Sequence, residues 1–306
     1  RILDAAMAAR IGELGFTRAS LGVQEFDPAV QAAINREQPV EVVADAVGML
    51  RKAGVCAINL DLLYGLPHQT VATLERSIAA CVPLRPDRVA LFGYAHVPWM
   101  ARAQRLIPEA ALPDAAARAA QAAAAALALR DAGYQAIGLD HFARPEDSMA
   151  IAARAGRLRR NFQGYTTDEA RTLLGLGVTA ISRTPAGFMQ AEPETGAWRL
   201  AVEAGRLPVH RGRALTNEDR LRGHVIERLM CVGEVDTDAA ARQHGADPGW
   251  CAAERALLRG MEGSGLIRVE GSRLILTEAG RPLARVVASV FDAYLEGGAA
   301  RHSVAV

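Results

Sequence analysis

The sequence predicts an α/β protein: part of a TIM-like (β/α) barrel, followed by a mostly helical, winged-helix-like domain. Short β-like runs alternate with helical patterns through the first two-thirds of the 306 residues, as in parallel βα units. No glycine-rich phosphate loop separates a strand from its helix, so a doubly wound sheet is the second choice. The change to closely spaced helices further on places the domains at 1–212 and 213–306.

The elements of the first domain follow from hydrophobic periodicity. Apolar residues three and four apart indicate the helices, and runs rich in β-branched residues indicate the strands. In chain order we predict a strand at Thr17–Gln24, a helix with Val43, Val47 and Leu50 on one face, a strand at Val55–Asp61, a helix with Leu74, Ile78 and Cys81 on its inner side, a strand at Arg88–Ala95, an alanine-rich helix at Pro113–Ala132, a strand at Tyr134–Leu139 and a weaker strand at Ala180–Arg183.

The second domain has the order of a winged helix. Three helices are predicted first, then two short strands around the turn Glu270-Gly271-Ser272, then a last helix. Acidic residues occur throughout these helices, so we expect a packing or lid role rather than DNA binding. The predicted ranges are helices at Asn217–Cys231, Asp236–Gln243 and Pro248–Ser264, strands at Leu266–Val269 and Arg273–Leu276, and a helix at Glu278–Leu295.

Composition excludes several classes of protein. Thirty-five basic residues nearly balance 34 acidic ones, for a net charge of +1, so charge gives no support for a nucleic-acid partner. No apolar run reaches the roughly 18 residues of a membrane span, and no signal-peptide pattern opens the chain. The four cysteines are widely scattered, unlike a disulfide framework or a metal-ligand cluster. Cys56 and Cys81 are expected to be small core residues. We expect a cytoplasmic monomer without a membrane span.

Polar residues at the carboxyl ends of the strands are the first candidates for ligand binding, because barrel ligands bind at that edge. The first strand ends at Gln24, and the second places Asn59 and Asp61 on one face while Cys56, Ile58 and Leu60 alternate onto the other. A carboxylate at the end of an apolar strand is costly to bury alone. We therefore expect Asp61 to be hydrogen-bonded either to the protein or to a ligand hydroxyl.

Other polar residues follow the third and fourth strands. His96 and His141 are candidates for acid–base chemistry, although a loop histidine is more often a surface or hydrogen-bonded residue. The segment Arg157–Thr167 combines arginines, aromatic residues and amides. This composition suits a carboxylated, partly apolar ligand, and a solvated loop is the alternative.

Five segments of the chain contain distinctive motifs. They are SLGVQEFDPAVQAAINREQ (20–38), INLDLLYGLPHQT (58–70), GYAHVPWMARAQRLI (93–107), GLDHFARPEDSMAIAARAGRLRRNFQGYTT (138–167) and LLGLGVTAIS (173–182). Together they resemble the oxygen-independent coproporphyrinogen III oxidases, a radical S-adenosylmethionine (radical SAM) family. GVQ and YGLP are shared by related families, whereas DHFARP and NFQGYTT are more specific to the oxidases.

The resemblance implies a radical SAM barrel with a [4Fe-4S] cluster, two S-adenosylmethionine molecules and an external electron donor. It implies that a 5'-deoxyadenosyl radical drives the oxidative decarboxylation of two propionates of coproporphyrinogen III to vinyl groups, giving protoporphyrinogen IX. Matched to the family motifs, Gln24, Arg36, Asp61 and Ala95 would contact the second S-adenosylmethionine, and Ile181 the first. We add the hypotheses that Arg36 pairs with a methionyl carboxylate and that the Arg159–Asn161 region binds substrate carboxylates.

One departure from the family pattern is severe. The CxxxCxxC motif that would hold the cluster is absent from these 306 residues, and three thiolates on one loop are needed to leave one iron open. We expect the sequence to begin partway through the barrel of a longer enzyme and to be inactive by itself. The alternatives are a cluster-less haem- or porphyrin-binding homologue and, less favoured, a DNA-binding regulator.

Overall fold

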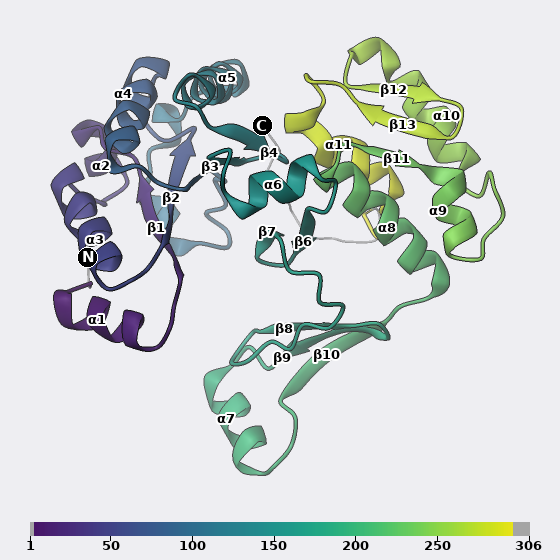
Figure 1. Cartoon of the computed structure of the whole chain (residues 1–306), viewed down its shortest axis with the longest axis horizontal. Helices are drawn as coiled ribbons and strands as arrows, with labels where there is room; N and C mark the ends of the chain where they lie inside the picture. The colour runs from purple at the N-terminus through teal and green to yellow at the C-terminus, as the bar shows by residue number, and fades with distance from the viewer. Residues whose placement is uncertain (1–2, 296–306) are drawn as a thin grey trace. The chain divides into compact units, whose positions relative to one another are not determined.

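A computed structural model describes residues 3–295, which form two compact units, 3–151 and 152–295 (Figure 1). We refer to these as the first and the second unit. The elements of the first unit are α1 (Ala5–Glu13), β1 (Arg18–Gln24), α2 (Pro28–Ala33), α3 (Val40–Lys52), β2 (Ala57–Tyr64), α4 (Val71–Cys81), the 3₁₀ turn η1 (Val82–Leu84), β3 (Arg88–Gly93), the 3₁₀ turns η2 (Arg102–Leu106) and η3 (Glu109–Ala111), α5 (Ala115–Asp131), β4 (Gln135–Ile137), β5 (His141–Ala143) and α6 (Ser148–Arg154), which runs into the second unit.

The first unit is built on a five-stranded sheet with the strand order β1-β2-β3-β5-β4 (Figure 1). Strands β1, β2 and β3 are parallel, and each is reached through a helix, as the alternating sequence pattern predicts. The register places Gly22 opposite Asp61, and Asp61 opposite Ala90. Strands β5 and β4 complete the sheet in the antiparallel sense.

The two faces of this sheet differ in polarity. Along β2, burial alternates strictly, so Ile58, Leu60 and Leu62 are buried while Asn59 and Asp61 on the other face are only partly buried. The buried face packs against apolar side chains of α3, α4 and α5, which together form one continuous core. The alternation was predicted from the sequence and is confirmed, and it places Asn59 and Asp61 on the face opposite the apolar core.

Two expectations for the first unit are wrong in detail. The strand predicted at Tyr134–Leu139 ends at Ile137, where Gly138 at φ 60° lets the chain reverse, and His141–Ala143 pairs back as β5 instead of forming a loop. Cys81 is buried as predicted, but Cys56 is exposed. Cys56 precedes the first residue of β2, so its side chain is not included in the strand's buried face.

The second unit contains three small antiparallel sheets, β6-β7, β10-β9-β8 and β11-β13-β12 (Figure 1). Its elements are β6 (Arg159–Asn161), β7 (Gly164–Thr166), β8 (Ile181–Thr184), β9 (Gly187–Ala191), α7 (Thr195–Glu203), β10 (Val209–Ala214), α8 (Asn217–Cys231), β11 (Glu234–Asp236), α9 (Thr237–Gln243), α10 (Ala252–Gly260), the 3₁₀ turn η4 (Glu262–Ser264), β12 (Ile267–Glu270), β13 (Arg273–Leu276), the 3₁₀ turn η5 (Arg281–Leu283), α11 (Ala284–Ala288) and the 3₁₀ turn η6 (Ser289–Phe291).

The strand predicted at Ala180–Arg183 exists as β8, but it does not belong to a parallel sheet. It forms a hairpin with β9, because the chain turns at once after Thr184 and pairs Ile181 with Gln190. Parallel pairing among the described residues is confined to β1, β2 and β3.

The C-terminal part of the second unit has the helix–strand–helix–helix–strand–strand order of a winged helix, from α8 to β13. The α/β class with a mostly helical, winged-helix-like C-terminal domain is therefore confirmed, whereas strand β11 was not predicted. The helix predicted at Glu278–Leu295 is shorter in the structure, because only α11 (Ala284–Ala288) is α-helical and the 3₁₀ turns η5, which contains Pro282, and η6 flank it. The domain boundary at 212/213 stays a prediction. Within 3–295, no helix has the length and apolar character needed to cross a bilayer.

Candidate ligand-binding site

On the partly buried face of β1 and β2, the side chains of Ser20, Asn59 and Asp61 are hydrogen-bonded to one another, and we call them the polar strip. Asp61 accepts hydrogen bonds from Ser20 Oγ at 3.1 and 3.2 Å and from Asn59 Nδ2 at 2.6 Å. Burial raises the pKa of Asp61, and the hydrogen bonds from Ser20 and Asn59 and the charge of His141 offset part of this rise. The protein therefore offsets only part of the free energy needed to ionise this buried carboxylate. A ligand that donates further hydrogen bonds would stabilise the ionised form.

Gln24 and Arg36 lie beside this strip because a glycine leaves them room. A Cβ on Gly22 would stand 2.9 Å from Gln24 Nε2 and 3.2 Å from Arg36 Nη2, and Gly22 is the register partner of Asp61. Gln24 itself adopts the left-handed region at φ 69°, which is uncommon for a residue other than glycine. The structure thus brings together three of the five predicted site residues.

Arg36 has an unused hydrogen-bond donor. Its Nη2 donates to the carbonyl oxygen of Gly22 at 2.6 Å, whereas its Nε is buried and has no partner among the described residues. Because a buried unpaired donor is costly, the guanidinium is suited to an incoming acceptor. A carboxylate fits best, since it can accept hydrogen bonds from Nε and Nη2 together.

The other two predicted site residues lie elsewhere. Ala95 is exposed just after β3, and its carbonyl oxygen accepts a hydrogen bond from Gln104 Nε2 at 3.0 Å. Ile181 opens β8 in the second unit. The cofactor contacts assigned to both residues stay predictions.

Of the two candidate histidines, His141 is the one whose charge acts on Asp61. It lies opposite Ala90, which in turn lies opposite Asp61, and its Nδ1 is hydrogen-bonded to Asp140 at 2.7 Å. His96 instead contacts the Tyr94 hydroxyl and the Glu109 carboxylate, each at 3.2 Å. His96 is therefore better explained as an ordinary hydrogen-bonded loop residue than as an acid–base group. This explanation fits His141 less well.

The Arg157–Thr167 segment forms the β6–β7 hairpin of the second unit. Arg159 Nη1 lies 3.5 Å from the carboxylate of Glu227. Arg160 stacks over the Tyr165 ring at 4.7 Å, and its buried Nη1 has no partner among the residues that the structure describes. Of the two arginines, Arg160 therefore has the donor that a carboxylate ligand could use.

Sequence reasoning missed a buried polar network behind the strip. Glu25 is 1% exposed, and its carboxylate accepts hydrogen bonds from the backbone of Phe26 and from the side chains of Gln69 and Ser77. These two side chains lie 44 and 52 residues away in the sequence. No local pattern could reveal a partner at that distance.

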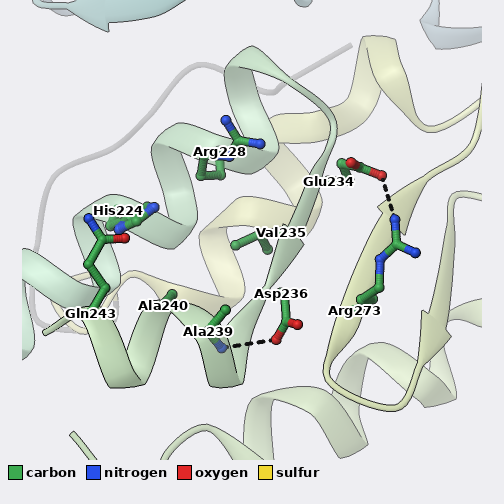
Figure 2. Close-up of a pocket in the computed structure, with 9 residues that line it drawn as sticks. All are labelled: His224, Arg228, Glu234, Val235, Asp236, Ala239, Ala240, Gln243 and Arg273. Atoms are coloured by element: carbon green, nitrogen blue, oxygen red, sulfur yellow. Dashed lines mark hydrogen bonds and ion pairs between the residues drawn. The ribbon is translucent and has the colours of Figure 1, made fainter. Parts of the chain in front are cut away.

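Two pockets within residues 3–295 lie apart from these side chains, and neither is lined by a predicted site residue. Figure 2 shows one of about 270 Å³ in the winged-helix part of the second unit, where Glu234 and Arg273 form an ion pair at 3.2 Å and Asp236 caps α9. The other, of about 310 Å³, lies in the first unit and is lined by Arg51, Cys56, Arg85, Asp87, Arg144 and Glu146.

The cysteines of this chain do not fit a [4Fe-4S] cluster. Cys56 is exposed in the first unit, whereas Cys81, Cys231 and Cys251 are buried at separate places. Burial raises the pKa of the Cys81 and Cys231 thiols to about 12, and only a thiolate is an effective ligand. No group of three His, Cys, Asp or Glu side chains within 3–295 is arranged to hold a metal ion.

Comparison with known proteins identifies the family. The chain is 49% identical over 306 residues to the oxygen-independent coproporphyrinogen III oxidase of Bradyrhizobium diazoefficiens, covering 100% of this chain and 68% of that protein. The chain belongs to this oxidase family. It is also 45% identical over 304 residues to the oxygen-independent coproporphyrinogen III oxidase of Paracoccus denitrificans, covering 99% of this chain and 67% of that protein.

Two protein-family models and one solved structure agree with this membership. The radical SAM superfamily model matches residues 1–81, and the HemN C-terminal domain model matches residues 215–283. The structure of coproporphyrinogen III oxidase from Escherichia coli, a radical SAM enzyme, superposes with a TM-score of 0.91 at 36% identity, covering 96% of this chain and 68% of that one. Membership of the radical SAM superfamily implies S-adenosylmethionine and a [4Fe-4S] cluster.

Proposed function

We propose that this chain forms the S-adenosylmethionine- and porphyrinogen-binding part of an oxygen-independent coproporphyrinogen III oxidase in haem biosynthesis. The enzyme converts two propionates of coproporphyrinogen III to vinyl groups and yields protoporphyrinogen IX. Each conversion removes a hydrogen atom from the β-carbon, one electron and the carboxylate carbon as CO₂. The likeness to the oxidases, which runs along the whole chain, carries this proposal.

We assign Gln24, Arg36, Asp61 and Ala95 to the second of two S-adenosylmethionine molecules and Ile181 to the first. S-adenosylmethionine supplies the hydrogen-abstracting group of this chemistry when it is bound. Asp61 of the polar strip and the neighbouring Arg36 and Gln24 have the matching polarity. Asp61 can accept hydrogen bonds from ribose hydroxyls or an amino group, Arg36 can donate to the methionyl carboxylate, and the Gln24 amide can do both.

Replacing Asp61 with asparagine is expected to weaken S-adenosylmethionine binding by on the order of tenfold, since a hydrogen bond to a charged group is lost. The ionised carboxylate is the better acceptor, and its pKa is raised by burial. Affinity of the unaltered chain should therefore fall as the pH is lowered through this raised pKa. Calorimetric titrations across pH would show this fall in the unaltered chain and its absence in Asp61→Asn.

The matched control is Asp45→Asn, which changes an exposed carboxylate on α3. This control should bind like the unaltered chain at every pH. Equal affinity of Asp61→Asn and the unaltered chain would remove Asp61 from the site.

Arg160 is assigned to a propionate carboxylate of the substrate. Coproporphyrin III, the air-stable oxidised form of the substrate, carries four carboxylates, whereas protoporphyrin IX carries two. Fluorescence titrations should show tighter binding of coproporphyrin, and Arg160→Met should reduce this preference by about tenfold, the value of one charge-assisted hydrogen bond. Arg199→Met, at an exposed position of α7, serves as the control. Equal affinity for both porphyrins in the unaltered chain would contradict the proposed substrate.

A further inference from the structure

The segment from Gln24 to Gln38 leaves the sheet at the end of β1 and is closed by one buried side chain, Gln31. Its Nε2 donates hydrogen bonds to the carbonyl oxygens of Glu25 at 2.7 Å and Gln38 at 2.8 Å. Its Oε1 accepts a hydrogen bond from the backbone N–H of Gln38 at 3.0 Å. Gln31 is only 5% exposed, so it ties both ends of the segment together from the inside.

The closed segment is also anchored to the rest of the first unit through Glu25. Its carboxylate accepts hydrogen bonds from the backbone N–H groups of Phe26 at 2.7 Å and Asp27 at 3.0 Å. Gln69 Nε2, in the loop after β2, donates to it at 2.7 Å, and Ser77 Oγ on α4 also donates. Glu25 therefore fixes the start of the segment, and Gln31 transmits that position to its end.

The position of Arg36 depends on this closed segment. Among the described residues its guanidinium donates one hydrogen bond, to Gly22, and its backbone N–H donates to the carbonyl oxygen of Gln31 at 2.9 Å. Asn35 adopts the left-handed region at φ 51°. The helix α2 within the segment has only six residues, too few to be stable without tertiary contacts. Loss of the Gln31 hydrogen bonds would free Arg36 to move.

We propose that Gln31, supported by Glu25, is a positioning residue that aims Arg36 at the carboxylate of S-adenosylmethionine without touching the ligand. This inference rests on the proposed function, because it requires S-adenosylmethionine beside Arg36. The proposal predicts that replacing Gln31 weakens the binding of a ligand that carries the amino-acid carboxylate. Binding of a ligand that has only the nucleoside part should not change.

The test compares two ligands on the full chain. S-adenosylmethionine carries the amino-acid carboxylate, whereas 5'-methylthioadenosine has the same nucleoside and lacks it. In Gln31→Met, which preserves the size of the side chain, calorimetry should show affinity for S-adenosylmethionine lowered about tenfold and affinity for methylthioadenosine unchanged, as expected for losing one charge-assisted contact. Gln243→Met, an exposed glutamine of α9, should change neither affinity.

A double variant shows whether Gln31 acts through Arg36. If it does, Gln31→Met combined with Arg36→Met should lose no more affinity than Arg36→Met alone, because coupled residues are not additive. Additive losses would overturn the proposal. Glu25→Gln is the second variant, for use if Gln31→Met does not fold. It retains the shape of the side chain but places an amide donor against the Gln69 donor. It should lower the affinity for S-adenosylmethionine and leave the affinity for methylthioadenosine unchanged.

The outcomes separate this inference from the proposed function. If the unaltered chain does not bind S-adenosylmethionine, the proposed function itself fails. If the unaltered chain binds it and Gln31→Met binds it equally well, only the positioning role is overturned. Equal losses for both ligands would make Gln31 a structural residue and would also overturn the positioning role.

Discussion

Asp147→Ala is expected to destabilise the first unit by about 3–5 kcal/mol, the usual cost of removing one partner from a buried ion pair. The Asp147 side chain is 5% exposed and lies 2.8 Å from the guanidinium of Arg88, itself 15% exposed. The same carboxylate accepts a hydrogen bond from the backbone of Met149 at 2.7 Å and lies 3.7 Å from Arg18. The alanine variant would leave the Arg88 charge buried without its carboxylate.

The matched control for Asp147 is an exposed ion pair in the same unit. Arg10 and Glu13 on α1 lie 3.0 Å apart with 68% and 64% of their side chains exposed, so Glu13→Ala should cost about 1 kcal/mol or less. Urea unfolding followed by circular dichroism gives both free energies of unfolding. Similar losses in the two variants would show that Asp147 is not essential to the packing of this unit.

Arg36→Met is expected to lower the affinity for S-adenosylmethionine by on the order of 100-fold, since two charge-assisted hydrogen bonds to a carboxylate would be lost. Methionine retains the length of the side chain and removes the charge. The affinity for methylthioadenosine, which lacks that carboxylate, should stay within about twofold of the unaltered chain, because no Arg36 contact to it is lost. Competition titrations with the two ligands measure the difference directly.

Arg10→Met is the control for Arg36, because it removes an exposed arginine of the same unit that lies on α1 and pairs with Glu13. It should bind both ligands like the unaltered chain. A parallel loss for both ligands in Arg36→Met would contradict the assignment of this guanidinium to the carboxylate.

The regular part of the first unit could be predicted because its signals are local. Apolar residues at helical spacing gave α3 and α4, and strict alternation along β2 separated the buried Leu60 from the polar Asp61. The strand-end rule then identified Gln24 and Asp61, which the structure brings together around Gly22. Arg36 came from the family resemblance alone, since nothing in the local sequence distinguishes it from the other arginines of the chain.

The features that could not be predicted depend on long-range partners. The three residues His141–Ala143 are too few to indicate a strand by themselves, and they pair as β5 only because β3 and β4 lie beside them. Ile181 begins a plausible barrel strand, yet the hairpin with β9 forms over a much shorter span. Glu25 and Gln31 are polar residues that are usually exposed, and they are buried here only because Gln38, Gln69 and Ser77 satisfy them.

The central claim is that the first unit binds S-adenosylmethionine through Asp61 of the polar strip and the neighbouring Arg36. Calorimetric titration of the unaltered chain, Asp61→Asn and Arg36→Met with S-adenosylmethionine tests it most directly. We predict saturable binding to the unaltered chain, weakened by on the order of tenfold in Asp61→Asn and 100-fold in Arg36→Met. Absence of binding to the unaltered chain, or equal binding by all three proteins, would contradict the claim.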